Sequence, residues 1–93
     1  MNKLKNRCDW QAEGILRAKP IVTRKSQRTY ATIHLDVNGG EIVAFAHDES
    51  LVKQVGALNP RDAVRLTGII EPRDPSRSSK APYFLNVLYI EQL

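Results

Sequence analysis

The segment from Thr29 to Val37 alternates apolar and polar side chains more clearly than any other part of the sequence. Its apolar residues share one face of an extended chain: Ala31, Ile33, Leu35 and Val37. The residues with polar groups share the other face: Tyr30, Thr32, His34 and Asp36. This period of two predicts a β-strand with one buried and one exposed face.

Asn38-Gly39-Gly40 follows this strand directly. Asn and Gly tolerate positive φ, so the tripeptide predicts a tight hairpin turn. Glu41 to His47 is then the partner strand. The segment Asp48 to Ala57 predicts a short helix, with Asp48 or Ser50 as the N-terminal cap and Gly56 where the helix would end.

Three further segments have strand character. Trp10 to Leu16 alternates loosely, with Gly14 marking a bulge or a sharp bend, and Ile21-Val22 prolongs this run after Pro20. Ala63 to Glu71 is the fourth expected strand, with Gly68 as a bend, and Tyr83 to Gln92 is the fifth.

Five strands with the only helix between the third and the fourth is the element order of the OB-fold, a small Greek-key barrel. The sequence therefore predicts an all-β fold, a five-stranded OB barrel with one short helix between strands 3 and 4. SH3-like barrels also have five strands, but they normally lack a helix of this length at that point. We expect residues 1–8 to be a flexible basic tail and residues 9–93 to be a single OB-fold domain.

The composition of the 93 residues excludes several classes of protein. Cys8 is the only cysteine, so the chain has no internal disulfide and no all-cysteine metal site. No signal peptide and no stretch of membrane-spanning length is visible, which predicts a cytoplasmic protein without a membrane partner. The net charge of +4 permits an anionic partner, although simple solubility would explain it equally well.

Basic residues concentrate in two separate tracts. The first carries Arg17, Lys19, Arg24, Lys25 and Arg28 without an acid among them. The second runs from Glu71 to Pro82, is broken by three prolines, and carries Arg73, Arg77 and Lys80. We expect Thr23 to Arg28 and the second tract to be loops. In an OB barrel the corresponding loops flank the exposed face of strands 2 and 3, so these cations would form the walls of a groove that follows phosphates. The alternative is that they are solvated loops.

Aromatic rings between such walls would stack on bases. The candidates are Tyr30, Phe45 and Tyr83, with Trp10 as a fourth candidate that could instead fill the core or plug the end of the barrel. Phe45 alternates with two alanines, so either parity could face the core. Thr32 and His34 share the polar face of Tyr30 and belong to the expected site. Phe84 and Tyr89 are expected to be packing residues.

Three segments resemble those of bacterial single-stranded-DNA-binding proteins and their relative, primosomal replication protein N. Residues 63–71 (AVRLTGIIE), preceded by Asn-Pro-Arg-Asp, resemble the fourth strand, and residues 83–91 (YFLNVLYIE) resemble the fifth. Residues 41–47 (EIVAFAH) resemble the third strand, in which an aromatic near the strand end often lies on the DNA face. The usual glycine-rich linker and acidic tip have no counterpart before Leu93, so the recruitment of partners through such a tip is not expected.

Together these features predict a protein that binds single-stranded DNA largely without sequence specificity, through basic loops and stacking aromatics, in replication, restart or recombination. One small barrel contacts few nucleotides, and open edge strands favour self-pairing, so a homodimer or higher oligomer is expected. Replication or recombination proteins are further possible partners. An RNA-binding OB domain and a protein-interaction subunit of a larger complex are the alternatives.

No catalytic, cofactor or metal site is expected. His34 and His47 are the only histidines, and no evident nucleophile accompanies them. One cysteine and two histidines do not form a zinc motif, and the sequence has no glycine-rich phosphate loop.

Overall fold

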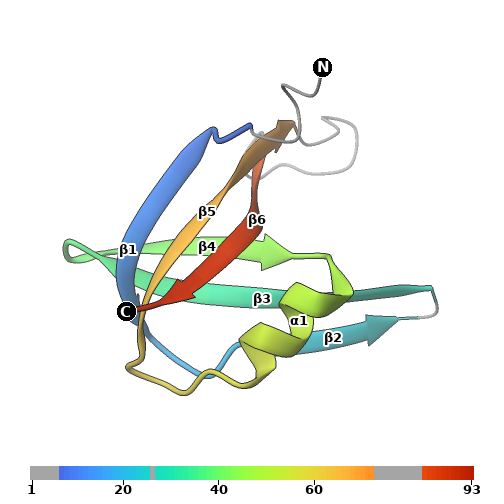
Figure 1. Cartoon of the computed structure of the whole chain (residues 1–93), viewed down its shortest axis with the longest axis horizontal. Coiled ribbons are helices and arrows are strands. Elements are labelled where there is room, and N and C mark those ends of the chain that lie inside the picture. Colours follow the sequence, from blue (N-terminus) through green and yellow to red (C-terminus); the bar gives the residue numbers. More distant parts are fainter. Residues whose placement is uncertain (1–6, 26, 73–82) are drawn as a thin grey trace.

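The computed structural model describes residues 7–25, 27–72 and 83–93. Within these residues the chain forms six strands and one helix (Figure 1). In chain order they are β1 (Trp10–Leu16), β2 (Ile21–Lys25), β3 (Arg28–Val37), β4 (Gly40–Ala46), α1 (Glu49–Gly56), β5 (Ala63–Pro72) and β6 (Tyr83–Gln92). Of the expected tail, residues 1–6 lie outside the described residues, while Arg7 forms an ion pair with Asp9 at 2.6 Å.

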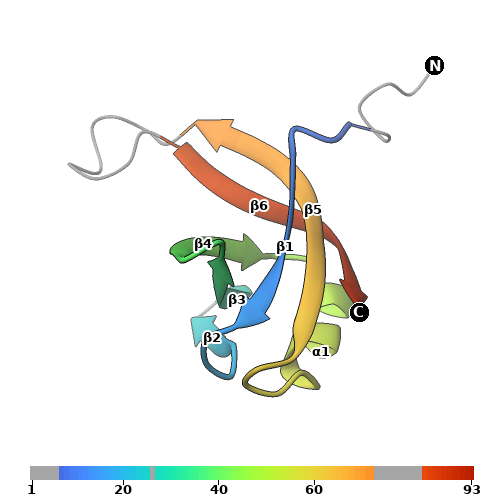
Figure 2. The same ribbon diagram turned by 90° about the vertical axis from the view of Figure 1, so that its left-hand side faces the viewer.

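Five of the strands close into a barrel in the order β1-β5-β6-β4-β3 (Figure 2). The β1–β3 pairs Ile15–Asp36 and Leu16–Leu35 complete the circle. At the opposite side, β4 and β6 meet in parallel at a single residue pair, Phe45–Asn86. β2 stays outside the circle and pairs with residues 28–32 of β3, along the same edge that meets β1 at residues 35–36. This closed five-stranded barrel with one helix agrees with the predicted OB-fold.

The position of the helix differs from the prediction. α1 lies after β4 and before β5, so it follows the fourth strand of the chain and not the third. The first expected strand is in fact two strands, β1 and β2, which separate around the buried Pro20. Proline has no backbone N–H to give to a strand ladder, which explains the break between them.

The expected loop from Thr23 to Arg28 was also wrong, since most of it is a β-hairpin. Arg24 pairs with Thr29, and Lys25 pairs with Arg28, as β2 joins β3. The tip of this hairpin is exposed on both faces, so its side chains carry no alternation of apolar and polar residues. Backbone hydrogen bonds hold the two strands together without that pattern.

The core follows the alternation of β3. Ala31, Ile33 and Leu35 are fully buried, as the period of two predicted. Apolar residues from every other described strand except β2, and from α1, complete one continuous cluster. α1 packs against β2, β3 and β6, and its buried stripe is Leu51, Val52 and Val55.

The predicted turn and cap are both confirmed. Asn38 and Gly39 have φ of 50° and 83°, the conformation that a two-residue hairpin turn between right-twisted strands requires. The Asp48 side chain accepts a hydrogen bond from the backbone N–H of Ser50 at 2.8 Å and so caps α1. Hydrogen bonds from Ser50, first from its side chain and then from its backbone, lower the pKa of Asp48.

Gly68 allows β5 and β6 to approach each other closely. The β5–β6 register shifts between Thr67 and Gly68, which confirms the expected bend. A Cβ atom at Gly68 would collide with the backbone carbonyl oxygen of Asn86. Beside it, the Trp10 indole donates a hydrogen bond to the Ile69 carbonyl at 3.0 Å and packs against the core, so Trp10 is a packing residue.

Candidate nucleic-acid interface

The outer face of the β2–β3–β4 sheet carries the exposed half of the β3 alternation. Since Ala31 and Ile33 point into the core, Tyr30 and Thr32 point outward. The β3–β4 register places Phe45 opposite Thr32, while its neighbours Ala44 and Ala46 are buried. Phe45 therefore lies on the outer face. The sequence alone allowed it to face either the core or the solvent.

Aromatic rings gather at this place. The rings of Tyr30 and Phe45 meet edge to face with 6.3 Å between centroids, and Phe84 of β6 meets Phe45 at 5.7 Å. The His47 ring completes the group, 5.9 Å from Tyr30 and 6.5 Å from Phe45. We call Tyr30, Phe45, His47 and Phe84 the aromatic cluster.

The aromatic cluster lies in a groove of about 680 Å³. One wall comes from the β2–β3 hairpin, through Gln27, Arg28 and Thr29. The opposite wall comes from the end of β5, through Glu71 and Pro72. A polar and cationic wall beside an aromatic floor has the chemistry that can contact the phosphates and bases of a single nucleotide strand.

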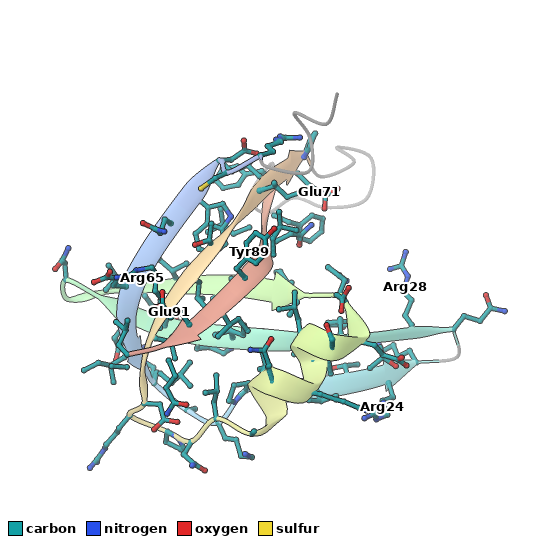
Figure 3. The ribbon with its side chains drawn as sticks, in the orientation of Figure 1. Arg24, Arg28, Arg65, Glu71, Tyr89 and Glu91 are labelled. Atoms are coloured by element: carbon teal, nitrogen blue, oxygen red, sulfur yellow. The ribbon has the colours of Figure 1, made fainter. Side chains whose placement is uncertain are left out.

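Three of the predicted cations lie on the hairpin. Arg28 lines the groove, and Lys25 is its cross-strand partner. Arg24 pairs with Thr29 at the alternate position, and Figure 3 shows it on the opposite side of the hairpin from Arg28. Within the described part of the chain no ion pair engages any of these three, so their charges are free to meet a phosphate.

Other predicted site residues are engaged elsewhere. Arg17 bridges Asp36 at 2.7 Å and Glu41 at 3.4 Å, and the hydrogen bond to Asp36 raises the pKa of Arg17. The same Glu41 carboxylate lies 3.1 Å from Nδ1 of His34. This charge network occupies the end of β3 away from Arg28, about 20 Å along the strand from Arg28 to His34 at the usual rise per residue.

Lys19 also has a structural partner. Its Nζ donates hydrogen bonds to the carbonyls of Gly56 at 2.9 Å and Leu58 at 3.0 Å. A lysine at the C-terminus of a helix satisfies carbonyls that lack partners within the helix and complements the helix dipole. Lys19 therefore fastens α1 to the β1–β2 connection.

The remaining predictions fall at the end of the β5–β6 pair. Tyr83 begins β6 opposite Pro72 and is 46% exposed. The cations Arg73, Arg77 and Lys80 belong to residues 73–82, outside the described residues. This segment joins Pro72 to Tyr83, and Pro72 is part of the groove wall.

Seven residues that line the groove are not among the predicted site residues: Gln27, Thr29, His47, Glu71, Pro72, Phe84 and Asn86. Phe84 was expected to pack and does contact Phe45, but it lies in the groove floor. Tyr89, also expected to pack, is 60% exposed. An asparagine between apolar residues, as in Leu85-Asn86-Val87, is the signal that could have drawn attention to β6, since a buried amide needs a partner.

The described residues contain no group of three His, Cys, Asp or Glu side chains that could hold a metal ion. None of the helical structure described is long and apolar enough to cross a membrane.

Two solved structures share this architecture. The small single-stranded-DNA-binding protein from Streptomyces coelicolor matches with a TM-score of 0.66 at 16% identity, over 89% of this chain and 89% of that chain. The second single-stranded-DNA-binding protein from Mycobacterium smegmatis matches with a TM-score of 0.63 at 9% identity, over 89% of this chain and 85% of its own. The chain shares the fold of these single-stranded-DNA-binding proteins. No protein-family model and no curated protein matches the sequence.

The shared fold gives the groove a defined place in the barrel. OB barrels bind oligonucleotides on one sheet face, between the loops that flank it. The corresponding face of this barrel is β3–β4, and the elements beside it are the β2–β3 hairpin and the adjoining ends of β5 and β6.

Proposed function

We propose that this protein binds single-stranded DNA in the groove, largely without sequence specificity. The observation that carries the proposal is the aromatic cluster, which lies on the groove floor beside Arg28, a cation that forms no ion pair with any described residue. Each base that stacks on an aromatic ring gains about 1–3 kcal/mol, and every base has a face that can stack. Stacking therefore supplies affinity without reading the sequence.

Phosphate contacts supply the second contribution. Arg28 and Lys25 extend along the hairpin at one side of the aromatic floor. Arg73, Arg77 and Lys80 are proposed to contribute from the segment that leaves the opposite wall at Pro72. A strand lying between the two would meet cations on both sides, as proteins that follow a phosphate backbone require.

The role is one of binding, without a chemical step. We place it in replication, restart or recombination, where single strands are exposed, with replication or recombination proteins as further partners. We also propose a homodimer or higher oligomer, because one groove contacts few nucleotides and β2 has a partner strand on one edge only among the described strands. Light scattering after size exclusion would measure the oligomeric state.

Fluorescence-anisotropy titration tests the function directly. Labelled oligo-dT, oligo-rU and a DNA duplex are titrated with protein at two salt concentrations. We expect oligo-dT to bind more tightly than the duplex, and its affinity to fall as salt rises. Equal or tighter binding of oligo-rU would move the assignment to RNA. A lack of binding to every single strand at low salt would refute the proposal and favour a protein-interaction subunit.

A further inference from the structure

Glu71 is an unexpected residue for a groove that binds a polyanion. It is the one acid among the described residues that line the groove, and it lies near the end of β5. A carboxylate there repels phosphates, so it weakens any purely electrostatic capture of a strand. A carboxylate is also a strong hydrogen-bond acceptor, and bases, unlike phosphates, offer N–H donors.

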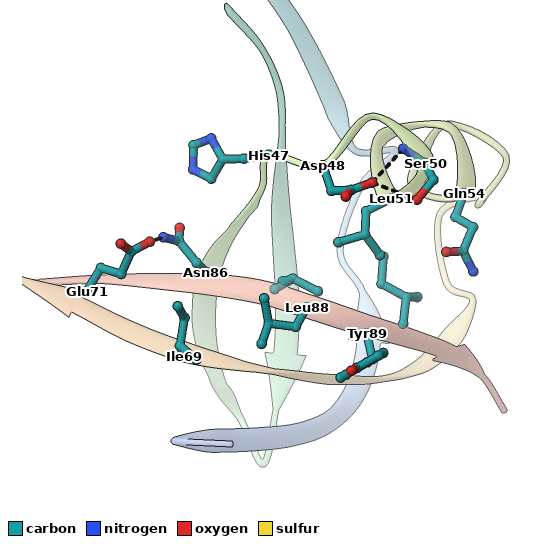
Figure 4. Close-up of a pocket in the computed structure, with 12 residues that line it drawn as sticks. His47, Asp48, Ser50, Leu51, Gln54, Ile69, Glu71, Asn86, Leu88 and Tyr89 are labelled. Atoms are coloured by element: carbon teal, nitrogen blue, oxygen red, sulfur yellow. Dashed lines mark hydrogen bonds between the residues drawn. The ribbon is translucent and has the colours of Figure 1, made fainter. Parts of the chain in front are cut away.

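Asn86 holds this carboxylate in place. Asn86 is buried, with 8% of the residue exposed, and its amide Nδ2 donates to Oε1 of Glu71. Figure 4 shows the two side chains pointing toward one another above β6, with His47 across from them. The amide oxygen of Asn86 has no hydrogen-bond partner among the residues that the structure describes. The protein therefore keeps a costly buried amide at this point, and its one side-chain bond among the described residues orients Glu71.

Strand pairing places this pair beside the stacking rings. Glu71 lies opposite Phe84 in the β5–β6 ladder, and Asn86 lies opposite Phe45 where β4 meets β6. A base stacked on Phe45 or Phe84 consequently has its edge next to the carboxylate. Glu71, Asn86 and His47 also line a second hollow of about 600 Å³ between α1 and β6, which leaves room for the edge of a purine.

We propose that Glu71, positioned by Asn86, recognises a guanine in the bound strand. Guanine offers two adjacent donors, N1–H and the N2 amino group, which match the two oxygens of one carboxylate. Adenine and cytosine offer one amino group beside a ring acceptor, and thymine offers one N–H between two carbonyls, so each of them sets an acceptor against the carboxylate. This inference rests on the proposed function and adds to it a base preference at one position.

The test compares alternating oligonucleotides of equal length, so that guanines never form a run. Unlabelled (dT-dG), (dT-dI), (dT-dA) and (dT) strands compete against labelled oligo-dT for the intact protein. Inosine keeps N1–H and lacks the amino group. We expect (dT-dG) to compete about tenfold better than (dT-dA), as hydrogen bonds to a charged acceptor imply, with (dT-dI) in between.

Variants then test which residue recognises guanine. Glu71→Gln should bring the (dT-dG) to (dT-dA) ratio to about one and should strengthen binding of oligo-dT, because it removes a repulsive charge. Glu49→Gln makes the same change on α1, away from the groove, and should keep the native ratio. Asn86→Ala should lower the ratio with little effect on oligo-dT. If that variant fails to fold, the Glu71→Gln variant and the (dT-dI) competitor still test whether Glu71 recognises guanine.

Failure of the two proposals can be told apart. If oligo-dT binds but the native ratio is about one, guanine recognition is refuted and the proposed function stands. A native preference that Glu71→Gln leaves intact refutes the assignment to Glu71. If no single strand binds, the proposed function itself is refuted.

Discussion

The ring of Phe45 meets the ring of Phe84 nearly at right angles, at 85° with 5.7 Å between their centroids. The two residues come from β4 and β6, strands that pair with each other at one position only in the described structure. An edge-to-face contact of this kind adds about 0.5–1.5 kcal/mol to the burial of the rings. In the groove floor, an aromatic contact therefore links β4 to β6.

Tyr30→Ala should weaken binding of oligo-dT by roughly 5- to 150-fold, the equivalent of one base stack of 1–3 kcal/mol. Tyr30 is on the outer face of β3 and partly exposed, so the thermal midpoint should change little. Tyr89→Ala is the matched control, because Tyr89 is 60% exposed and does not line the groove. Unchanged affinity together with a large loss of stability would make Tyr30 a packing residue.

Arg28→Ala should reduce the slope of log affinity against log salt for oligo-dT by about 0.7, the value for one phosphate contact on a single strand. Arg65→Ala removes the same charge from the outside of the barrel, where Arg65 bridges Glu13 at 2.6 Å and also Glu91. Its slope should equal that of the native protein. Equal slopes for native protein and Arg28→Ala would remove Arg28 from the interface.

Gly68→Ala should destabilise the fold by about 1–3 kcal/mol or more, as overpacking of a tight site does. The added methyl meets the Asn86 backbone, which cannot move without disturbing the β5–β6 ladder. Gly56→Ala is the control, since nothing lies within 4 Å of a Cβ there and alanine favours the helix. Urea unfolding measures both, and equal stability of the two variants would contradict the close approach.

Acid should destabilise the protein in part through Asp48. Its pKa is lower when folded, so the charged cap stabilises the fold above the unfolded value of about 3.9 and loses this contribution as pH falls through the folded value. Asp48→Asn keeps a capping acceptor without a titrating carboxyl. Thermal midpoints should therefore fall less steeply below about pH 4 in this variant, and an identical fall would assign the acid sensitivity to other groups.

Local patterns predicted the parts of the fold that depend on neighbouring residues. The alternation of β3, the Asn38-Gly39 turn and the Asp48 cap are each settled within a few residues, and the structure confirms them. The hairpin from Thr23 to Arg28 was misread because its exposed strands bury nothing on either side at the tip. Polar composition there predicts a loop whether or not the backbone is paired.

The site was less predictable because tertiary contacts decide which charges are free. Arg17 and Lys19 looked equivalent to Arg28 in sequence, yet one is bound by acids and the other by helix carbonyls. The Glu71–Asn86 contact depends on the β5–β6 register, which shifts at Gly68. No local pattern contains that information.

Among the described residues, β4 and β6 pair only at Phe45–Asn86, and we call this junction the seam. The other neighbouring strands of the barrel pair over two or more residues. Parting the strands at the seam breaks the backbone bonds of one pair, whereas parting β5 from β6 breaks a ladder of nine paired positions. The backbone amides of the seam should accordingly exchange hydrogen with solvent through a local opening of lower free energy than the amides of the neighbouring ladders. Such an opening would widen the groove between β4 and β6 while the β2–β3 and β5–β6 ladders stay intact.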